Sequence, residues 1–252
     1  SIDLKKYLVD NSSDIRSDTM VREIDRDLYD QDGIILDQIG ASAAGQLPKG
    51  FDPSSLYPAR QHPRALQMTI FGMGDALGQL GVDWKVIQEK IAPDEVAVFS
   101  GAAIGQLDSF GFGGLMQSRL KGSRASSKNL ALGLVEMSAD FINAYILGSV
   151  GRTGHVVGAC ATFLYNLQMG KEAIESGSAR FVVVGGAEAP ITPEIVDGFY
   201  AMSALSDDKR MMEMQAQHNE NLTEGPIQNK ACRPFGQNVG MVLGESAQFI
   251  IL

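Results

Sequence analysis

The stretch HVVGACATFLYNLQMGKEAIESGSARFVVVGGAE, residues 155–188, decides the fold. Residues 155–157 predict a strand, and the small residues of 158–161, Gly-Ala-Cys-Ala, predict a tight turn. Apolar residues then recur at helical spacing as far as Gly177. The run 181–186 is apolar throughout, as in a strand covered on both faces of a sheet. Strand, helix and strand in this order predict parallel strands with a right-handed crossover, which is an α/β fold.

Further elements are predicted on both sides of this stretch. Apolar residues at helical spacing predict a helix that Pro63 opens and Gly81 ends. Residues 96–99 are a short apolar run and predict a buried strand, whereas residues 129–147, rich in Leu, Met, Phe and Ile, predict a helix. Residues 246–252 predict a further strand.

A boundary between two parts of the chain is placed after residue 45. Residues 1–45 have no readable pattern and end in a Gly- and Ala-rich segment, 40–45, which predicts a loop or a flexible joint. We assign residues 46–252 to one domain. Within it, residues 207–231 are charged and rich in Met and Gln, which predicts a surface insertion.

Composition argues against several classes of protein. The 252 residues are 44% hydrophobic and 20% charged, as in an ordinary soluble protein, and no run approaches the roughly 18 apolar residues that span a membrane. The net charge of −9 argues against nucleic-acid binding. The glycine-rich stretch 101–114 lacks both the GxGxxG order and a Walker lysine, which disfavours nucleotide binding. Two distant cysteines, Cys160 and Cys232, form no disulfide framework and favour a reducing cytoplasm.

Cys160 lies where the predicted strand turns into the predicted helix. A helix N-terminus carries a partial positive charge and free N–H groups. The charge favours the nucleophilic thiolate, and the N–H groups can hold a developing oxyanion. Local sequence leaves two interpretations open, a nucleophile and a small buried core cysteine. Cys232 lies in no such turn, so we expect a structural role for it.

The three histidines give Cys160 no evident catalytic partner within this chain. His155 lies one side-chain alternation out of phase with Cys160, so we expect it on the opposite face. His62 and His218 are expected at the surface. A nucleophilic cysteine usually has a basic partner, so the sequence disfavours an unrelated cysteine hydrolase.

Several ordered blocks resemble one enzyme family at compatible spacings, which is more specific than any single motif. The blocks are Phe99-Ser100-Gly101-Ala102-Ala103-Ile104-Gly105, Gly158-Ala159-Cys160-Ala161-Thr162, Val182-Val183-Val184-Gly185-Gly186-Ala187-Glu188, Gly198-Phe199-Tyr200-Ala201-Met202-Ser203-Ala204-Leu205-Ser206, Cys232-Arg233-Pro234-Phe235 and Gly244-Glu245-Ser246-Ala247. They are similar to the nucleophile-bearing part of β-ketoacyl-acyl-carrier-protein synthases, the I/II-type condensing enzymes of the thiolase superfamily.

This resemblance implies an activity. The family moves an acyl group from acyl carrier protein onto the cysteine, here Cys160, whose backbone N–H is an oxyanion donor. It then decarboxylates a malonyl thioester and joins the two by Claisen condensation in fatty-acid or polyketide elongation. Substrates travel on the phosphopantetheine of the carrier or on coenzyme A, and neither a bound cofactor nor a metal is expected.

The resemblance also implies a fold and an assembly. The fold is the N-terminal part of a thiolase-like, five-layer αβαβα fold of the α/β class, with a mixed, largely parallel sheet. The assembly is a homodimer in which residues 155–157 pair across the two-fold axis. Two histidines, a lysine and a second oxyanion donor come from the family's C-terminal half, and none of those positions occurs here. We therefore expect a fragment, a truncated core or one half of an assembly.

One departure from the family follows Phe235. The family reads Arg-Pro-Phe-Asp and then Arg-Asp-Gly-Phe, whereas Phe235 is here followed by Gly-Gln-Asn-Val-Gly. Together with the long insertion, this difference suggests a divergent subgroup.

Apolar side chains near Cys160 are candidates for an acyl pocket, although most of them are expected simply in the core. They are Phe110, Phe112, Met137, Phe163, Phe199 and Met202. By analogy with the family, residues 106–108 lie near a gate. An unpaired Asp108 facing an acyl chain would be unfavourable, which favours very short acyl groups.

Basic residues are candidates for docking an acidic carrier protein, because an acidic chain needs a local basic face to avoid repulsion. They are Arg60, Arg64, Lys121, Arg124 and Lys128, with Arg119 nearby. Arg60 and Arg64 are expected one helical turn apart on one face of the predicted helix. An ordinary solvated basic face is the alternative.

The alternative function is a non-catalytic subunit that resembles a condensing enzyme, binds carrier protein and shapes a partner's pocket. Such chain-length subunits typically lack the cysteine. The presence of Cys160 therefore favours the enzyme.

Overall fold

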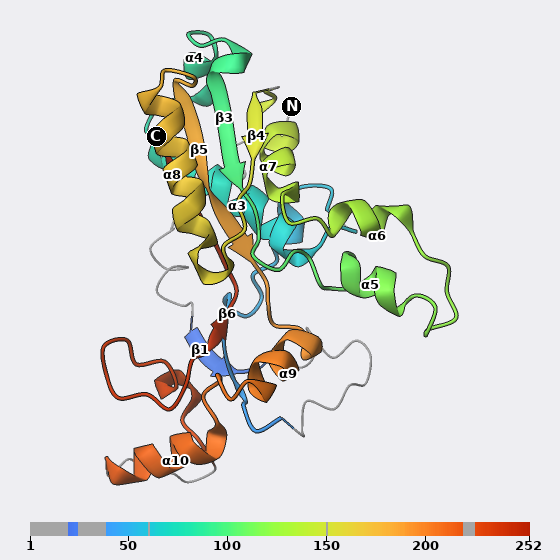
Figure 1. Ribbon diagram of the computed structural model, residues 1–252, viewed down its shortest axis with the longest axis vertical. Coiled ribbons are helices and arrows are strands. Elements are labelled where there is room, and N and C mark those ends of the chain that lie inside the picture. Colours follow the sequence, from blue (N-terminus) through green and yellow to red (C-terminus); the bar gives the residue numbers. More distant parts are fainter. Residues whose placement is uncertain (1–19, 25–38, 60, 150, 219–224) are drawn as a thin grey trace. The chain divides into compact units, whose positions relative to one another are not determined.

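The computed structural model describes residues 20–24, 39–59, 61–149, 151–218 and 225–252. They form two compact units, each with its own sheet and hydrophobic cluster (Figure 1). The first unit holds the described part of Asp52–Glu188 together with Ser246–Leu252, and it contains Cys160. The second unit holds the described parts of Ser13–Phe51 and Ala189–Glu245.

The first unit alternates helices and strands. Its helices are α3 (Arg64–Gln79), α4 (Trp84–Gln88), α5 (Phe112–Gln117), α6 (Ser127–Leu132), α7 (Met137–Phe141) and α8 (Thr162–Glu175), and a π-helical turn, Ile142–Leu147, continues α7. Its strands are β3 (Val96–Ser100), β4 (Arg152–Gly154), β5 (Phe181–Glu188) and β7 (Ser246–Ile251). Short 3₁₀ turns occupy Pro53–Leu56, Pro93–Glu95 and Ala159–Ala161.

The sheet of the first unit has the strand order β4-β3-β5-β7. β3 is parallel to both β4 and β5, whereas β7 runs antiparallel to β5. The strands predicted at residues 96–99, 181–186 and 246–252 are therefore confirmed. The predicted parallel strands on either side of α8 are also confirmed, with β3 lying between them. The sheet is mixed and largely parallel, as predicted.

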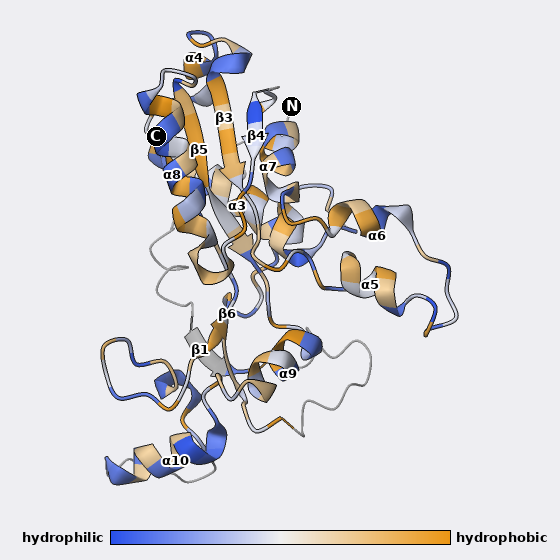
Figure 2. Cartoon of the chain, in the orientation of Figure 1, coloured by the Kyte–Doolittle hydropathy of each residue, from blue (hydrophilic) through white to orange (hydrophobic). Residues whose placement is uncertain are grey.

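Helices cover both faces of this sheet, because successive side chains of a strand point to opposite faces. Val96 and Val98 of β3 pack in a cluster with residues of α3 and α7, whereas Ala97 and Phe99 pack in a cluster with residues of α8. The central strands β3 and β5 are accordingly apolar along most of their length (Figure 2). The first unit thus has three layers, with α3 and α7 on one face and α8 on the other.

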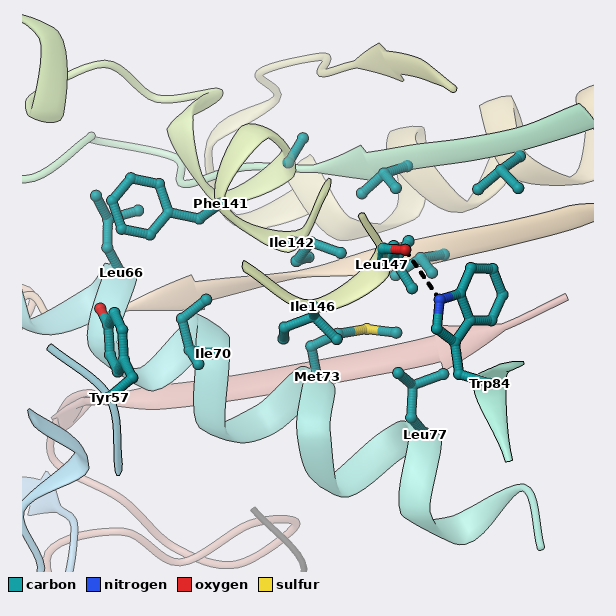
Figure 3. Close-up of a cluster of buried hydrophobic side chains, with 14 of the residues drawn as sticks. Tyr57, Leu66, Ile70, Met73, Leu77, Trp84, Phe141, Ile142, Ile146 and Leu147 are labelled. Atoms are coloured by element: carbon teal, nitrogen blue, oxygen red, sulfur yellow. Dashed lines mark hydrogen bonds between the residues drawn. The ribbon is translucent and has the colours of Figure 1, made fainter. Parts of the chain in front are cut away.

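The hydrophobic cluster on the α3 face confirms the predicted helix. Leu66, Ile70, Met73 and Leu77 lie on one side of α3 and are buried (Figure 3). Their spacing of three to four residues is that of an amphipathic helix. At the far end of the cluster, the indole N–H of Trp84 donates to the carbonyl oxygen of Leu147 at 2.9 Å.

The prediction of one helix over residues 129–147 is wrong, because the chain breaks between α6 and α7. At the break, Gly133 lies under the ring of Phe112, and a Cβ on Gly133 would be 2.5 Å from that ring. The carbonyls of Gly133 and Val135 accept hydrogen bonds from the glycine-rich stretch at 3.2 and 2.8 Å. This long-range role leaves no periodic signal in the sequence.

The strand predicted at residues 155–157 is also misplaced, since the strand is β4, three residues earlier. Residues after Gly154 leave the sheet because a side chain of α8 forms a hydrogen bond with their backbone. The N–H of Val156 donates to Oδ1 of Asn166 at 3.0 Å, which replaces a bond to a neighbouring strand.

The second unit has a small sheet of order β1-β2-β6, made of β1 (Met20–Glu23), β2 (Ala43–Gln46) and β6 (Leu243–Gly244). Its helices are α9 (Pro193–Ala201) and α10 (Asp208–Gln217), with a 3₁₀ turn at Gln228–Lys230. The loop predicted at 40–45 is wrong in part, because β2 pairs antiparallel with β1 and parallel with β6. Most of residues 1–45 lie outside the described residues.

The predicted surface insertion, residues 207–231, contains α10. This helix is not wholly at the surface, because one side of it packs within the second unit. Met211 and Met214 are buried on that side. The amide of Gln215 bonds the backbone N–H and carbonyl of Ile227 at 3.0 and 3.2 Å. The charged residues that suggested a surface position lie on the other sides of the helix, and residues 219–224 lie outside the described residues.

His62 is half-buried, which corrects the expectation of a surface residue. Its ring packs edge-on against Phe141 with 4.9 Å between ring centroids, and its Nδ1 lies 3.0 Å from the hydroxyl of Tyr57. Burial, and then the nearby charge of Lys128, lower the pKa of His62. His218 is exposed, as expected.

Changing Trp84 to Phe should destabilise the protein by about 1–3 kcal/mol, because it leaves the buried Leu147 carbonyl without its short hydrogen bond. The amide of Gln88, at 3.4 Å, remains as a weak partner. Thermal unfolding of the intact protein, followed by circular dichroism, measures the loss. The control Val86→Ala, at an exposed position of α4, should change the unfolding free energy by less than about 0.5 kcal/mol. Equal effects of the two changes would contradict the role of the hydrogen bond.

The lowered pKa of His62 predicts a pH-dependent stability. As the pH falls through the ordinary pKa of 6.5, His62 binds a proton more readily in the unfolded chain than in the folded chain, so unfolding becomes easier. The variant His62→Gln lacks this loss. As the pH is lowered from about 7.5 to about 5.5, the Tm of His62→Gln relative to the parent protein should therefore rise. His218→Gln controls for removing a histidine elsewhere, and a constant Tm difference for His62→Gln would refute the prediction.

Candidate active site

The turn that carries Cys160 is a strained connection between β4 and α8. Ala159 has a φ of +48°, in the left-handed region that residues with a Cβ rarely adopt. The turn passes through the 3₁₀ segment Ala159–Ala161 directly into α8. Cys160 is exposed, so the structure does not place it in the core of the first unit. Cys232 is exposed as well, in the second unit.

Two side chains at the start of α8 hold this turn in place. The N–H of Gly158 donates to Oγ1 of Thr162 at 3.0 Å, and the N–H of Val156 donates to Oδ1 of Asn166 at 3.0 Å. Thr162 and Asn166 are buried and lie one helical turn apart. Sequence reasoning missed both. The available signal was a Thr and an Asn, residues that bond nearby backbone, directly after a turn of small residues.

His155 braces the turn from the other side. Its Nε2 donates to the carbonyl of Ala102 at 3.0 Å, and its Nδ1 accepts from Nδ2 of Asn166 at 3.1 Å. These partners match a neutral ring with its proton on Nε2. Both nitrogens of His155 are therefore engaged by Ala102 and Asn166.

Cys160 follows the carboxyl edge of the parallel strands, because the turn continues directly from β4. Open α/β sheets bind ligands at this edge. Among the residues that the structure describes, no backbone acceptor receives the N–H of Cys160. That N–H is available to an oxyanion on an acyl group bound to the sulfur.

Glu188 ends β5 at the same edge. Its carboxylate accepts a hydrogen bond from the backbone N–H of Ala103, which joins the end of β5 to the residues that follow β3. Burial raises the pKa of Glu188, and the bond from Ala103 opposes this rise. Glu188 thus fixes the start of the glycine-rich stretch.

Three of the candidate acyl-pocket residues lie in separate hydrophobic clusters. Met137 packs on the α3 face, Phe163 packs with the residues under α8, and Phe199 packs in the second unit. These three side chains are partly buried against the clusters, whereas we expected core positions for most of the six candidates.

Among the described residues, the other three candidates are not members of these clusters. Phe110 is exposed in the loop before α5, and Phe112 begins α5 with its ring over Gly133. Both belong to the glycine-rich stretch of the first unit. Met202 follows α9 in the second unit and is exposed.

Asp108 does not stand unpaired before an acyl chain. Its Oδ2 accepts from the N–H of Arg64 at 2.7 Å, and its Oδ1 accepts from the N–H groups of Phe110 and Gly111 at 2.9 and 3.1 Å. The argument from Asp108 to very short acyl groups therefore loses its physical basis.

The candidate docking residues lie in two segments of the first unit that touch. Nζ of Lys128 donates to Oε1 of Gln61 at 2.6 Å, which joins the start of α6 to the residues before α3. Arg64 is the first residue of α3, and Lys121 and Arg124 are exposed between α5 and α6, as is Arg119. Arg60 lies outside the described residues. The expected spacing of Arg60 and Arg64 therefore stays a prediction, and the structure shows only that α3 begins at Arg64.

Among the residues that the structure describes, no group of three or more His, Cys, Asp or Glu side chains is arranged to hold a metal ion. In the same ranges, every helix is too short or too polar to cross a membrane.

The family model described as "Beta-ketoacyl synthase, N-terminal domain" matches residues 3–252. Among curated proteins, the chain is 52% identical over 210 residues to the beta-ketoacyl-[acyl-carrier-protein] synthase FabY of Pseudomonas aeruginosa, covering 83% of this chain and 32% of FabY. It is 30% identical over 195 residues to 3-oxoacyl-[acyl-carrier-protein] synthase 2 of Staphylococcus aureus, covering 77% of this chain and 43% of that protein.

Solved structures agree with these matches. The crystal structure of the ketosynthase FabY from P. aeruginosa superposes with a TM-score of 0.78 at 51% identity, over 84% of this chain and 32% of that chain. A beta-ketoacyl synthase from Burkholderia phymatum shares the fold alone, with a TM-score of 0.69 at 20% identity, over 95% of this chain and 53% of that chain. The chain thus spans about a third of the length of FabY, as the 32% coverage states. With the family match extending over residues 3–252, the chain belongs to the β-ketoacyl synthase family and corresponds to its N-terminal, thiolase-like domain.

Proposed function

We propose that this chain is the nucleophile-bearing part of a β-ketoacyl synthase that carries an acyl group on Cys160. The observation that supports it most is the exposed Cys160 on a strained turn at the N-terminus of the 14-residue helix α8. The helix dipole favours a thiolate at this position. The relatives named as beta-ketoacyl-[acyl-carrier-protein] synthases support the same reaction.

The proposed reaction has two stages. In the first, the Cys160 thiolate attacks the carbonyl of an acyl thioester, the N–H of Cys160 stabilises the oxyanion, and the carrier's phosphopantetheine leaves as its thiolate, which takes a proton from water. In the second, a malonyl thioester loses CO₂, and the resulting enolate carbon attacks the acyl group on Cys160. A carbon–carbon bond forms, the thioester bond to Cys160 breaks, and the thiolate returns. The reaction needs neither a bound cofactor nor a metal.

Two alternative functions explain the site less well than this proposal. A non-catalytic subunit that only binds carrier protein would have no use for an exposed cysteine on a strained turn. An unrelated cysteine hydrolase needs a base near the sulfur, and His155 has both ring nitrogens engaged by Ala102 and Asn166. Acyl transfer to carbon is therefore the better explanation of the site.

The proposal extends to the acyl chain, the carrier protein and the assembly. Phe110 and Phe112 would face the acyl chain, and the basic residues of the two docking segments would bind an acidic carrier protein. β4 is an edge strand, so a second copy of the chain would extend the sheet and form a homodimer. The two free cysteines favour the reducing cytoplasm as its location.

Incubation of the intact protein with an acyl-carrier thioester should add the mass of one acyl group. Cys160→Ala should abolish the adduct and lower condensation by at least about a thousandfold, because the thioester has no other anchor. Cys232→Ala, which removes the other exposed cysteine, should keep both. Full condensing activity in Cys160→Ala would overturn the proposal.

The double variant Arg64→Gln, Arg124→Glu should slow acyl transfer from carrier protein by about tenfold at low salt, because surface charges act mainly on the rate of encounter. Gln is chosen at position 64 because Glu would repel Asp108. The difference from the parent protein should shrink at high salt.

Two controls accompany this measurement. Alkylation of Cys160 by iodoacetamide, an uncharged reagent, should proceed at the parent rate in the double variant. Lys85→Glu with Lys90→Glu, two exposed lysines in and after α4, should leave acyl transfer unchanged. Parallel loss of alkylation would point to a damaged fold, and unchanged transfer would remove the docking role.

A further inference from the structure

A chain of hydrogen bonds connects the end of β3 to the turn that carries Cys160. Its first bond joins Nε2 of His155 to the carbonyl oxygen of Ala102 at 3.0 Å. The second joins Nδ1 of His155 to Nδ2 of Asn166 at 3.1 Å. In the third, Oδ1 of Asn166 accepts the N–H of Val156 at 3.0 Å. The imidazole ring is therefore the middle link between the sheet and the backbone just before the turn.

Backbone groups fix the direction of every bond in this chain. The amide of Asn166 has one orientation, because the N–H of Val156 only donates and the carbonyl of Thr162, 3.0 Å from Nδ2, only accepts. Nδ2 of Asn166 is thus a donor to His155, and Nδ1 of His155 must accept. The carbonyl of Ala102 only accepts, so Nε2 must donate. The chain of bonds therefore requires a side chain at position 155 with one acceptor and one donor.

Packing also holds the ring of His155. A Cβ on Gly101 would lie 2.3 Å from Nδ1 and Cε1 of this ring, so the ring lies directly against the backbone of Gly101. The position of His155 is set by this close contact and by its two hydrogen bonds together. A role in packing and a role in hydrogen bonding predict different results for substitutions that preserve only one of the two.

The turn sets the direction of one N–H group. Ala159 has a φ of +48°, and the peptide that follows it carries the N–H of Cys160. A residue with a Cβ stays in the left-handed region only where the surrounding structure holds it there. The segment before the turn is held at Val156, through the amide that His155 contacts. The direction of the Cys160 N–H therefore depends on a chain of bonds that includes the imidazole ring.

We propose that His155 is a positioning residue for the acylation of Cys160, because its two hydrogen bonds, acting through Asn166, keep the N–H of Cys160 aimed at the oxyanion of the attacked thioester. This inference rests on the proposed function, since it needs an acyl thioester at Cys160. Acylation builds an oxyanion on the carbonyl. Alkylation of the same sulfur by iodoacetamide displaces iodide from a saturated carbon and builds no oxyanion. Comparison of the two reactions therefore separates the direction of the N–H from the reactivity of the thiolate.

The test gives the intact protein octanoyl-N-acetylcysteamine, a small thioester that needs no docking of a carrier protein. The Cys160 thiolate attacks its carbonyl, a thioester bond to Cys160 forms, and N-acetylcysteamine leaves as its thiolate, which takes a proton from water. Mass spectrometry follows the acylation rate over a range of thioester concentrations. The rate at which iodoacetamide alkylates Cys160 is measured in parallel.

His155→Phe keeps a ring against Gly101 and removes both hydrogen bonds. It should lower the maximal acylation rate by at least about tenfold, because a misdirected N–H stabilises the oxyanion poorly. The half-saturating thioester concentration and the alkylation rate should stay close to those of the parent protein, since the oxyanion forms only in the transition state of acylation.

His155→Gln does the reverse, because it removes the ring and keeps a donor and an acceptor on one amide. It should restore the acylation rate to within about threefold of the parent rate. His155→Asn keeps an acceptor for Asn166 but is too short to reach Ala102. This milder variant should lower acylation without changing alkylation, and it decides the test where His155→Phe unfolds.

The matched control is His218→Phe, which makes the same substitution at the exposed histidine that ends α10 in the second unit. It should keep the parent rates of both acylation and alkylation.

The outcomes separate this role from the proposed function. Unchanged acylation in His155→Phe, or an equally large loss in His155→Gln, would overturn the proposal in favour of packing of the ring. Equal losses of acylation and alkylation would assign His155 to the position of the sulfur and would also overturn it. A parent protein that takes no acyl group from this thioester or from acyl carrier protein would overturn the proposed function, and the role of His155 with it.

Discussion

The hydrogen bonds of Asn166 are the constraint on which the candidate site depends. Its amide is fully buried, and its oxygen accepts the N–H of Val156 while its nitrogen donates to the carbonyl of Thr162 and to His155. A buried amide is tolerated only when these groups are satisfied, so the path of the chain from β4 to α8 has little freedom. The strained turn at Ala159 persists because both of its ends are held in this way. The position of Cys160 is therefore a consequence of how α8 docks on the sheet.

Elements with a strong local pattern were predictable from sequence. α3, α8, β3, β5 and β7 all have apolar residues at the spacing or in the runs that their burial requires, and the structure places each within a few residues of its predicted bounds. The turn at Cys160 was predictable for a different reason. Small residues between a predicted strand and a predicted helix are typical of a tight turn. Family resemblance added the chemistry of the cysteine, which local pattern left open.

Elements that depend on distant partners were not predictable. The break at Gly133 exists because the ring of Phe112 and the backbone of Gln106 pack there, and neither contact leaves a periodic signal. β4 was misplaced because Asn166 competes for the backbone that an extended strand would use. His62 was expected at the surface because nothing in its local sequence shows the rings of Tyr57 and Phe141 that surround it. In the site, Asn166 and Thr162 were missed for the same reason, because their role depends on the backbone groups to which they are hydrogen-bonded.

The glycines of residues 101–114 have two possible explanations, phosphate binding and close packing. Glycines after a strand can leave N–H groups open to a phosphate, and the sequence disfavoured that explanation because it lacks both the GxGxxG order and a Walker lysine. The structure gives the physical reason. A Cβ on Gly101 would lie 2.3 Å from the ring of His155, and one on Gly111 would lie 2.0 Å from the carbonyl of Gln106. Here glycine permits backbone and rings to approach more closely than any side chain allows, and the N–H groups of Phe110 and Gly111 are already taken by Asp108. The same close packing that removes an anion site makes the loop sensitive to small movements of the segments around it.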